Sequence, residues 1–175
     1  AVTEAGALFC WGSNYYGELG VDTPGLELAP VPVEAARVWT TVSAGMGSTC
    51  AVEDDGSVWC FGRLGEVDGA PRLVESGAVS VSAGGDVACG LRPGKLSCWG
   101  SNFHEVLGTG LAGVQREPVS FGDFTDVEEI ASGFEHTCVR RSDGTIWCAG
   151  YNNYGQLGDG TQTTRGTPIQ VGPET

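Results

Sequence analysis

A segment that begins and ends with cysteine occurs three times in the sequence, and it constrains the fold more than any other feature. It is Cys-Ala-Val-Glu-Asp-Asp-Gly-Ser-Val-Trp-Cys at 50–60, and it recurs in altered form at 89–98 and 138–148. In each copy two short runs that suit β-strands flank a turn with Asp-Gly or Pro-Gly, which is the pattern of a β-hairpin. The sequence therefore predicts three hairpins, each bounded by cysteines.

The spacing of the cysteines predicts cross-strand disulfides. Cysteines at facing positions of adjacent strands are close enough to be joined, and three such bonds indicate an oxidising compartment. Zinc binding and free thiols are the rival explanations, and the Cys-x-x-Cys and His-x-x-x-His clusters that zinc needs do not occur in the sequence. The expected pairs are Cys50–Cys60, Cys89–Cys98 and Cys138–Cys148.

Cys10 is the seventh cysteine and has no equivalent partner in the sequence. Counting back by the spacing of the other pairs leads to the position just before Ala1. We therefore expect Cys10 to be unpaired here, its partner to lie just outside this sequence, and the chain to be a piece of a longer protein.

Aligning the hairpins reveals a longer repeat. The second cysteine recurs at 10, 60, 98 and 148, with periods of 50, 38 and 50. A Trp-Gly-Ser-Asn box or a variant follows it, then Gly-x-Leu-Gly in two copies, a Pro-containing strand, and a strand of small residues such as Val42–Gly45. Four short strands per repeat predict an all-β fold of propeller blades with four antiparallel strands each. A linear solenoid of strands is the alternative.

These repeats divide one domain, 1–175, into five parts. We expect a partial blade at 1–12, repeats at about 13–62, 63–100 and 101–150, and a partial blade at 151–175. In this scheme the N-terminus supplies the last two strands of a blade and Thr167–Val171 supplies its first strand. The second repeat lacks the Asn and Gly-x-Leu-Gly boxes, so its loop at 63–69 is expected to be tight.

Charge and hydropathy exclude several functions. The net charge is −13 with a pI near 4.3, and such a surface repels phosphate backbones, so we expect no nucleic-acid partner. The sequence has no run of 18 apolar residues, so no membrane insertion is expected.

Candidate catalytic and metal-binding residues are few. His104 and His136 are the two histidines, and no Ser-His-Asp order, nucleophile elbow or phosphate loop accompanies them. Three Asp-Gly pairs, which end at Gly56, Gly144 and Gly160, lack the alternating acids of a calcium loop and suit hairpin turns. We therefore expect no enzyme activity, cofactor or metal.

Four boxes in a fixed order resemble one known family. Trp-Gly-x-Asn, Gly-x-Leu-Gly, Val-x-Ala-Gly-x-x-His-x-Cys and Asp-Gly-x-x-Trp-Cys resemble the regulator of chromosome condensation repeats, and the match is best over 130–157. The form with cysteines is similar to bacterial, exported members. The resemblance implies a seven-bladed propeller, of which three complete repeats and two partial ones make about half. The chain is then an excised fragment, or two copies form a homodimer that completes a ring. A four-bladed monomer with an incomplete closing blade is a less favoured alternative.

The resemblance also implies a binding site. In this family the two residues after Ala-Gly form loop tips on one face, and several members hold partners there. Phe134 and Met46 suit hot-spot anchors, and His136 matches a repeated histidine whose implied role is a structural hydrogen bond. The matching tip residues are Met46, Gly47, Gly85, Asp86, Phe134 and Glu135.

These observations favour a non-catalytic protein-binding module of a secreted or cell-surface protein. A carbohydrate-binding or glycan-processing propeller is the first alternative, because Tyr15 and Tyr151 are candidate sugar platforms. A purely structural segment of a longer surface protein is the second. The aromatic residues after the Trp-Gly boxes are either surface anchors or packing between blades, and they are Tyr15, Tyr16, Phe103, Tyr151 and Tyr154.

Overall fold

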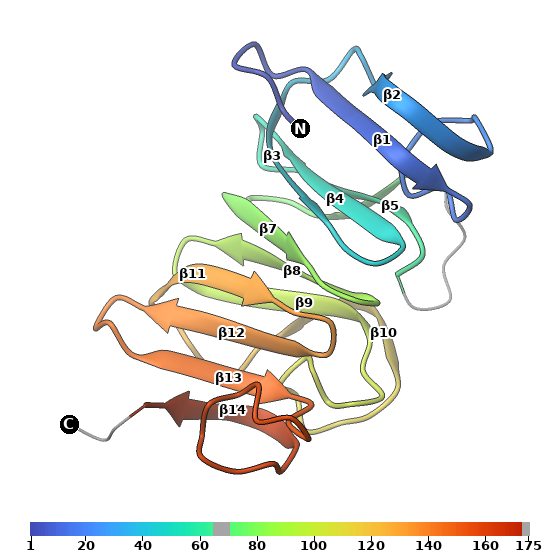
Figure 1. Cartoon of the computed structure of the whole chain (residues 1–175). Helices are drawn as coiled ribbons and strands as arrows, with labels where there is room; N and C mark the ends of the chain where they lie inside the picture. The colour runs from blue at the N-terminus through green and yellow to red at the C-terminus, as the bar shows by residue number, and fades with distance from the viewer. Residues whose placement is uncertain (65–70, 173–175) are drawn as a thin grey trace.

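The computed structural model describes residues 1–64 and 71–172, which form fourteen β-strands joined by turns and loops (Figure 1). The strands make four sheets, and each sheet follows chain order with antiparallel pairing. The first sheet contains β1 (Leu8–Asn14) and β2 (Gly25–Val33). The second contains β3 (Trp39–Ala44), β4 (Ser48–Glu53), β5 (Val58–Gly62) and β6 (Arg72–Glu75).

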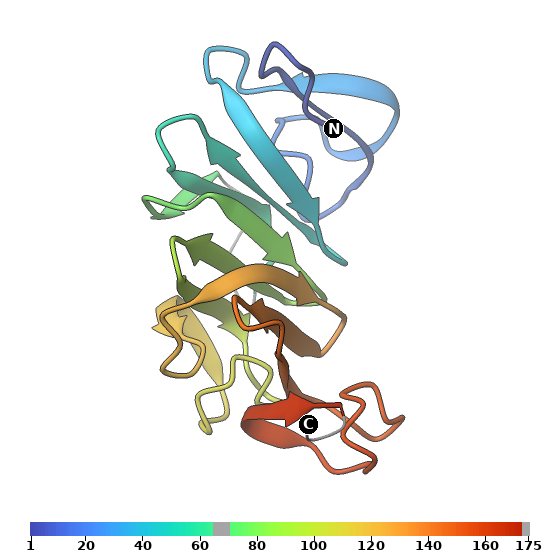
Figure 2. The ribbon, with the colours of Figure 1, turned by 90° about the vertical axis from the view of Figure 1, so that its left-hand side faces the viewer.

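The third and fourth sheets repeat this arrangement. The third contains β7 (Ser80–Ala83), β8 (Val87–Arg92), β9 (Lys95–Ser101) and β10 (Val114–Ser120). The fourth contains β11 (Val127–Ser132), β12 (His136–Arg141), β13 (Ile146–Gly150) and β14 (Arg165–Val171). The sheets are stacked like blades in order along the chain, and the termini lie at opposite ends of the stack (Figure 2). The expected four-stranded blades are confirmed.

The strand that closes each blade differs from the expected scheme. We assigned Thr167–Val171 to the first strand of an incomplete blade, and this was wrong, because β14 pairs with β13 as the fourth strand of the last sheet. The loop after the Trp-Gly box turns the Pro-containing strand back against the hairpin that precedes it. The next strand of small residues then begins a new blade. β2, β6, β10 and β14 are edge strands, where a proline leaves no ladder donor missing.

The cysteine hairpins are the middle strands of the blades, and their disulfides are present as expected. Each bond closes a short loop and contributes about 3 kcal/mol in the chain-entropy model. The cysteines of the first two bonds are buried in hydrophobic clusters. In the third bond Cys148 is buried and Cys138 is half-buried. The disulfides Cys50–Cys60, Cys89–Cys98 and Cys138–Cys148 have Cα separations of 4.1, 4.0 and 4.1 Å.

The strands of small residues lie where neighbouring blades meet. β7 contacts both β3 and β11. A Cβ atom on Gly45 would collide with the carbonyl oxygen of Gly84, and a Cβ on Gly84 would collide with that of Gly133. The backbones therefore approach too closely for any larger residue, which explains the glycines that follow β3 and β7.

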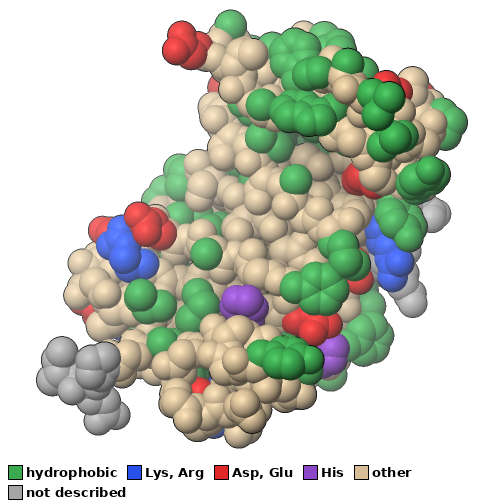
Figure 3. Space-filling model, in the orientation of Figure 1, with side chains coloured by type: hydrophobic (Ala, Val, Ile, Leu, Met, Phe, Trp, Pro, Cys, Tyr) green, Lys and Arg blue, Asp and Glu red, His purple; other side chains and the backbone are tan. Residues whose placement is uncertain are grey.

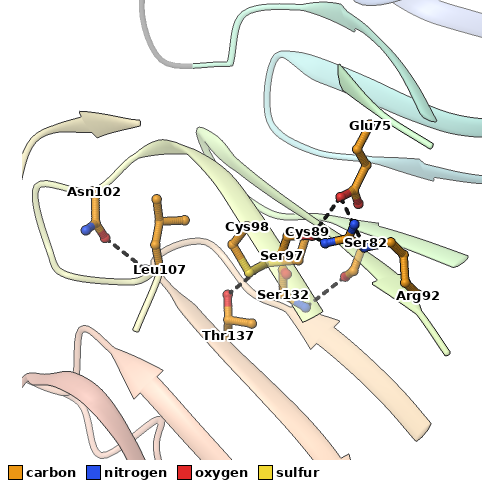
Figure 4. Close-up of a disulfide and its surroundings, with 10 residues drawn as sticks. All are labelled: Glu75, Ser82, Cys89, Arg92, Ser97, Cys98, Asn102, Leu107, Ser132 and Thr137. Carbon is orange, nitrogen blue, oxygen red and sulfur yellow. Dashed lines mark hydrogen bonds and ion pairs between the residues drawn. A yellow bond between two sulfur atoms is a disulfide. The ribbon is translucent and has the colours of Figure 1, made fainter. Parts of the chain in front are cut away.

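Serine hydroxyls tie these inner strands together. The Ser43 Oγ accepts a hydrogen bond from the Ala83 N–H at 2.9 Å, and the Ser82 Oγ accepts one from the Ser132 N–H at the same distance (Figure 4). Each bond joins one blade to the next. The expected tight loop at 63–69 falls mostly in residues 65–70, which lie outside the described residues.

Candidate functional site

Three buried asparagines shape the loops that follow β1, β9 and β13. We call Asn14, Asn102 and Asn152 the loop asparagines; each is almost completely buried. Their side-chain oxygens accept hydrogen bonds from backbone N–H groups five residues later, at 2.8–2.9 Å. Their side-chain nitrogens donate to carbonyl oxygens further along the same loops. One buried amide thus fixes both ends of each loop.

The loop asparagines place aromatic side chains on the surface. Phe103 directly follows Asn102 and is 67% exposed, while Tyr154 is two residues after Asn152 and is 85% exposed. Tyr15 and Tyr16 after Asn14 are also exposed. These residues are surface groups, so the alternative of packing between blades does not hold for them.

Tyr151 differs from the other aromatic residues of these loops. It is half-buried, and its ring contacts those of His104 and Tyr154, with centroids 5.1 and 6.1 Å apart. The Tyr151 ring therefore packs against the rings beside it, and only part of its own surface is accessible.

The turns after the inner strands meet in a row at the same end of the blades. The Met46 N–H donates to the Gly84 carbonyl at 3.1 Å, and the Gly85 N–H donates to the Phe134 carbonyl at 3.1 Å. A Cβ on Gly47 would lie 3.2 Å from the ring of Tyr16. The structure thus brings together the six tip residues expected from the sequence and sets them beside the aromatic loops.

We call this surface the tip face, and it combines apolar and charged groups. Phe134 is 56% exposed and Met46 is 63% exposed. Hydrophobic side chains lie beside acidic and histidine side chains on the right-hand side of the molecule in Figure 3. The tip face consists of Tyr15, Tyr16, Met46, Arg63, Asp86, Phe103, His104, Phe134, Glu135 and Tyr154. The two glycines of the tips, Gly47 and Gly85, are buried.

Charged side chains interact across the blades within the tip face. The Nδ1 atom of His104 lies 2.7 Å from Oε1 of Glu135. Arg63 lies 3.9 Å from the Asp86 carboxylate and 5.7 Å from the centre of the Tyr16 ring. Sequence reasoning missed the roles of Arg63 and His104, because neither residue belongs to a repeated box.

His136 is half-buried at the start of β12. Its ring lies so close to Gly133 that a Cβ on this glycine would collide with it, and burial lowers the pKa of the imidazole. Within residues 1–64 and 71–172 the ring makes no hydrogen bond, and the structural hydrogen bond that the resemblance implies stays a prediction. The Asp-Gly turns behave as expected: Asp55 and Asp143 each accept a backbone N–H two residues later.

Cys10 is a free, buried cysteine. Burial raises the pKa of its thiol. Ala1 and Phe9 exchange two backbone hydrogen bonds, of 2.7 and 2.8 Å, as facing residues of an antiparallel pair do. The partner of Cys10 remains a prediction.

Comparison with known protein families decides the classification. Models described as "Regulator of chromosome condensation (RCC1) repeat" match residues 5–52 and 143–175, and a related model of the same description matches residues 127–156. The chain belongs to the RCC1 repeat family. Among curated RCC1-repeat relatives, the ultraviolet-B receptor UVR8 of Arabidopsis thaliana is 32% identical over 98% of this chain and 43% of its own length. The E3 ubiquitin-protein ligase HERC2 of Homo sapiens is 34% identical over 91% of this chain and 4% of its length.

Solved RCC1-repeat structures have the same fold. Human WBSCR16 superposes with a TM-score of 0.86 at 20% identity, over 98% of this chain and 50% of that one. Prp20p of Saccharomyces cerevisiae superposes with a TM-score of 0.85 at 23% identity, over 99% of this chain and 48% of that one. The chain thus spans half or less of the length of these relatives, and it forms about half of an RCC1-type β-propeller. A search of the described residues finds no helix able to cross a membrane.

Proposed function

We propose that this RCC1-repeat chain is a non-catalytic protein-binding module and that its partner binds the tip face. The observation that carries the proposal is the gathering of exposed Met, Phe and Tyr side chains at one end of four successive sheets. Exposed apolar side chains that form a patch with polar neighbours mark interaction sites. Tyr, Phe, Met and Arg are also the residues enriched at protein interfaces.

The architecture supports this function. The Asn102 and Asn152 side chains and the backbone bonds between turns hold the tip face in one conformation. A rigid surface binds at a lower entropic cost than a mobile one. Among the relatives, Prp20p is described with binding to Gsp1p and histones, and also in complex with Kap60. Those partners belong to Prp20p, and they support the class of function only.

A displayed peptide library tests the proposal. The library is panned on the immobilised chain, and selected clones are then measured on Phe134→Ala and on Leu28→Ala. Leu28 is the matched control, because it is an exposed apolar side chain on the edge strand β2. We expect clones whose affinity falls at least tenfold on Phe134→Ala and stays unchanged on Leu28→Ala. Clones that bind both variants like the wild type would refute the tip face as the binding site.

We further propose that the protein is exported, as a secreted or surface protein of the bacterial type that its cysteines resemble. The support is the set of three disulfides between facing strands, since such bonds persist in oxidising compartments. Alkylation of free thiols in protein from its native source tests this proposal.

Binding of a carbohydrate is the second candidate, and two exposed side chains favour it. Tyr15 and Tyr154 are 77% and 85% exposed, and a flat, accessible aromatic ring can stack on a sugar ring. Glycan-array binding that disappears with Tyr15→Ala or Tyr154→Ala, and persists with Phe134→Ala, would favour this function over protein binding.

A further inference from the structure

One hollow of the tip face has walls of distinct chemistry. It lies where the β7–β8 turn meets the β11–β12 turn and the loop after β9, and its volume is about 50 Å³. Two carboxylates and two phenyl rings line it, together with one imidazole. These residues are Asp86, Phe103, His104, Phe134 and Glu135.

The carboxylates retain capacity to accept hydrogen bonds. The side chains of Asp86 and Glu135 are 29% and 30% exposed. Glu135 uses Oε1 toward His104, and the contact of Asp86 with Arg63 is long, at 3.9 Å, with the arginine half exposed. Exposed ion pairs of this kind contribute little free energy. A cation that reaches the hollow can therefore compete for Asp86 and share Glu135.

The aromatic walls favour the same kind of ligand. Phe103 and Phe134 line the hollow and are both more than half exposed. The faces of phenyl rings attract cations and also cover methylene groups. An ammonium is compact, whereas a guanidinium is a wide plane with five donors. A hollow of about 50 Å³ suits the ammonium better.

We propose that this hollow binds a lysine side chain of the partner protein. The inference rests on the proposed function of the tip face and names the chemistry that this face recognises. The ammonium interacts with Asp86 and Glu135, and the methylene groups contact Phe103 and Phe134. The net charge of −13 attracts a basic partner toward the surface and raises the association rate.

Titration with defined peptides tests the proposal by NMR of the ¹⁵N-labelled chain. The probe is the capped peptide Gly-Ser-Leu-Lys-Leu-Ser-Gly, and its matched controls carry norleucine or arginine in place of lysine. We expect the lysine peptide to have a Kd at least fivefold lower than either control peptide. The shifted amides should include those of Phe103 and Glu135, and the preference should weaken in 0.5 M salt, since salt screens partly exposed charges.

Variants that remove one negative charge test whether Asp86 and Glu135 cause the preference for the lysine peptide. Asp86→Asn and Glu135→Gln should each raise the Kd of the lysine peptide at least threefold and leave that of the norleucine peptide unchanged. Glu4→Gln is the control, because Glu4 is exposed in the turn before β1, at the opposite end of the blades. Amide spectra that match the wild type outside the hollow show that each variant is folded.

The outcomes separate this proposal from the function on which it rests. Equal Kd values for the lysine and norleucine peptides, or tighter binding of the arginine peptide, would overturn the lysine proposal. Library clones that depend on Phe134 but tolerate replacement of every lysine would also overturn it, while the tip face remained a binding site. Absence of any clone that depends on Phe134 would overturn both.

Discussion

The Ser82 hydroxyl accepts a hydrogen bond from the backbone N–H of Ser132 at 2.9 Å, and this bond connects the third sheet to the fourth. The same arrangement joins Ser43 to Ala83 one blade earlier. Blades that are held by repeated backbone contacts present their turns in a fixed row. The tip face therefore depends on bonds that lie beneath it, between the inner strands.

Ser82→Ala should destabilise the chain by about 1–2 kcal/mol. The substitution leaves the Ser132 N–H without its acceptor between two packed strands, and an unsatisfied buried donor costs about 1–3 kcal/mol. Urea denaturation measures the change in the free energy of unfolding. Ser76→Ala is the control, because Ser76 is exposed, and it should differ from the wild type by less than about 0.5 kcal/mol. Equal effects of the two substitutions would contradict the role of the Ser82 hydroxyl.

Asn152→Ala should cost more, about 2–4 kcal/mol, since the buried amide both accepts and donates hydrogen bonds within its loop. Asn153→Ala is the matched control, because Asn153 is the next residue along the chain and is exposed. Thermal denaturation compares the two variants. If the Tm values of the two variants differed by only 1–2 °C, the effect would be too small for this role of the Asn152 amide.

Glu75 should make the free energy of unfolding depend on pH, and the burial of its carboxyl sets the sign of this dependence. Its carboxyl is buried against the third sheet, and this burial raises its pKa, although a hydrogen bond from Ser97 and the charge of Arg92 oppose the shift (Figure 4). An acid with a raised folded pKa stabilises the fold when it is protonated. That stability is lost as the pH rises above 4.5, the ordinary pKa of a glutamate carboxyl.

Glu75→Gln isolates this contribution. The free energy of unfolding of the variant, minus that of the wild type, should increase as the pH is raised from 4.5 toward 7. Urea titrations at several pH values measure the difference, and other titrating groups cancel in it. A difference that stays constant or decreases with pH would show that the carboxyl is not destabilised by its burial.

Alkylation counts the free thiols. Of seven cysteines, six form disulfides and Cys10 is free. Denatured but unreduced chain should therefore take up one iodoacetamide group, and reduced chain should take up seven, as measured by mass spectrometry. Native chain should react slowly, because burial raises the pKa of the Cys10 thiol. In protein from its native source, peptide mapping that finds label without reduction on the cysteines of the three pairs, Cys50–Cys60, Cys89–Cys98 and Cys138–Cys148, would contradict both the disulfides and the proposed export.

The sequence by itself determined the local structure. Cysteines at both ends of a hairpin predicted the disulfides, because facing positions on adjacent strands follow directly from the turn between them. The order of the boxes predicted the strands and the RCC1 repeat. The two residues after Ala-Gly marked the tips, since glycine ends each inner strand where backbones come closest, as at Gly45 and Gly84.

Only the tertiary structure decided how these strands pair and which surface they present to a partner. β14 closes the blade of β13 because strand pairing depends on how the intervening loop returns, which residue types in a strand do not encode. Phe103, His104 and Glu135 meet although His104 and Glu135 are 31 positions apart in the sequence. Their contact arises from the stacking of two blades, so the hollow between Asp86 and Glu135 exists only in three dimensions.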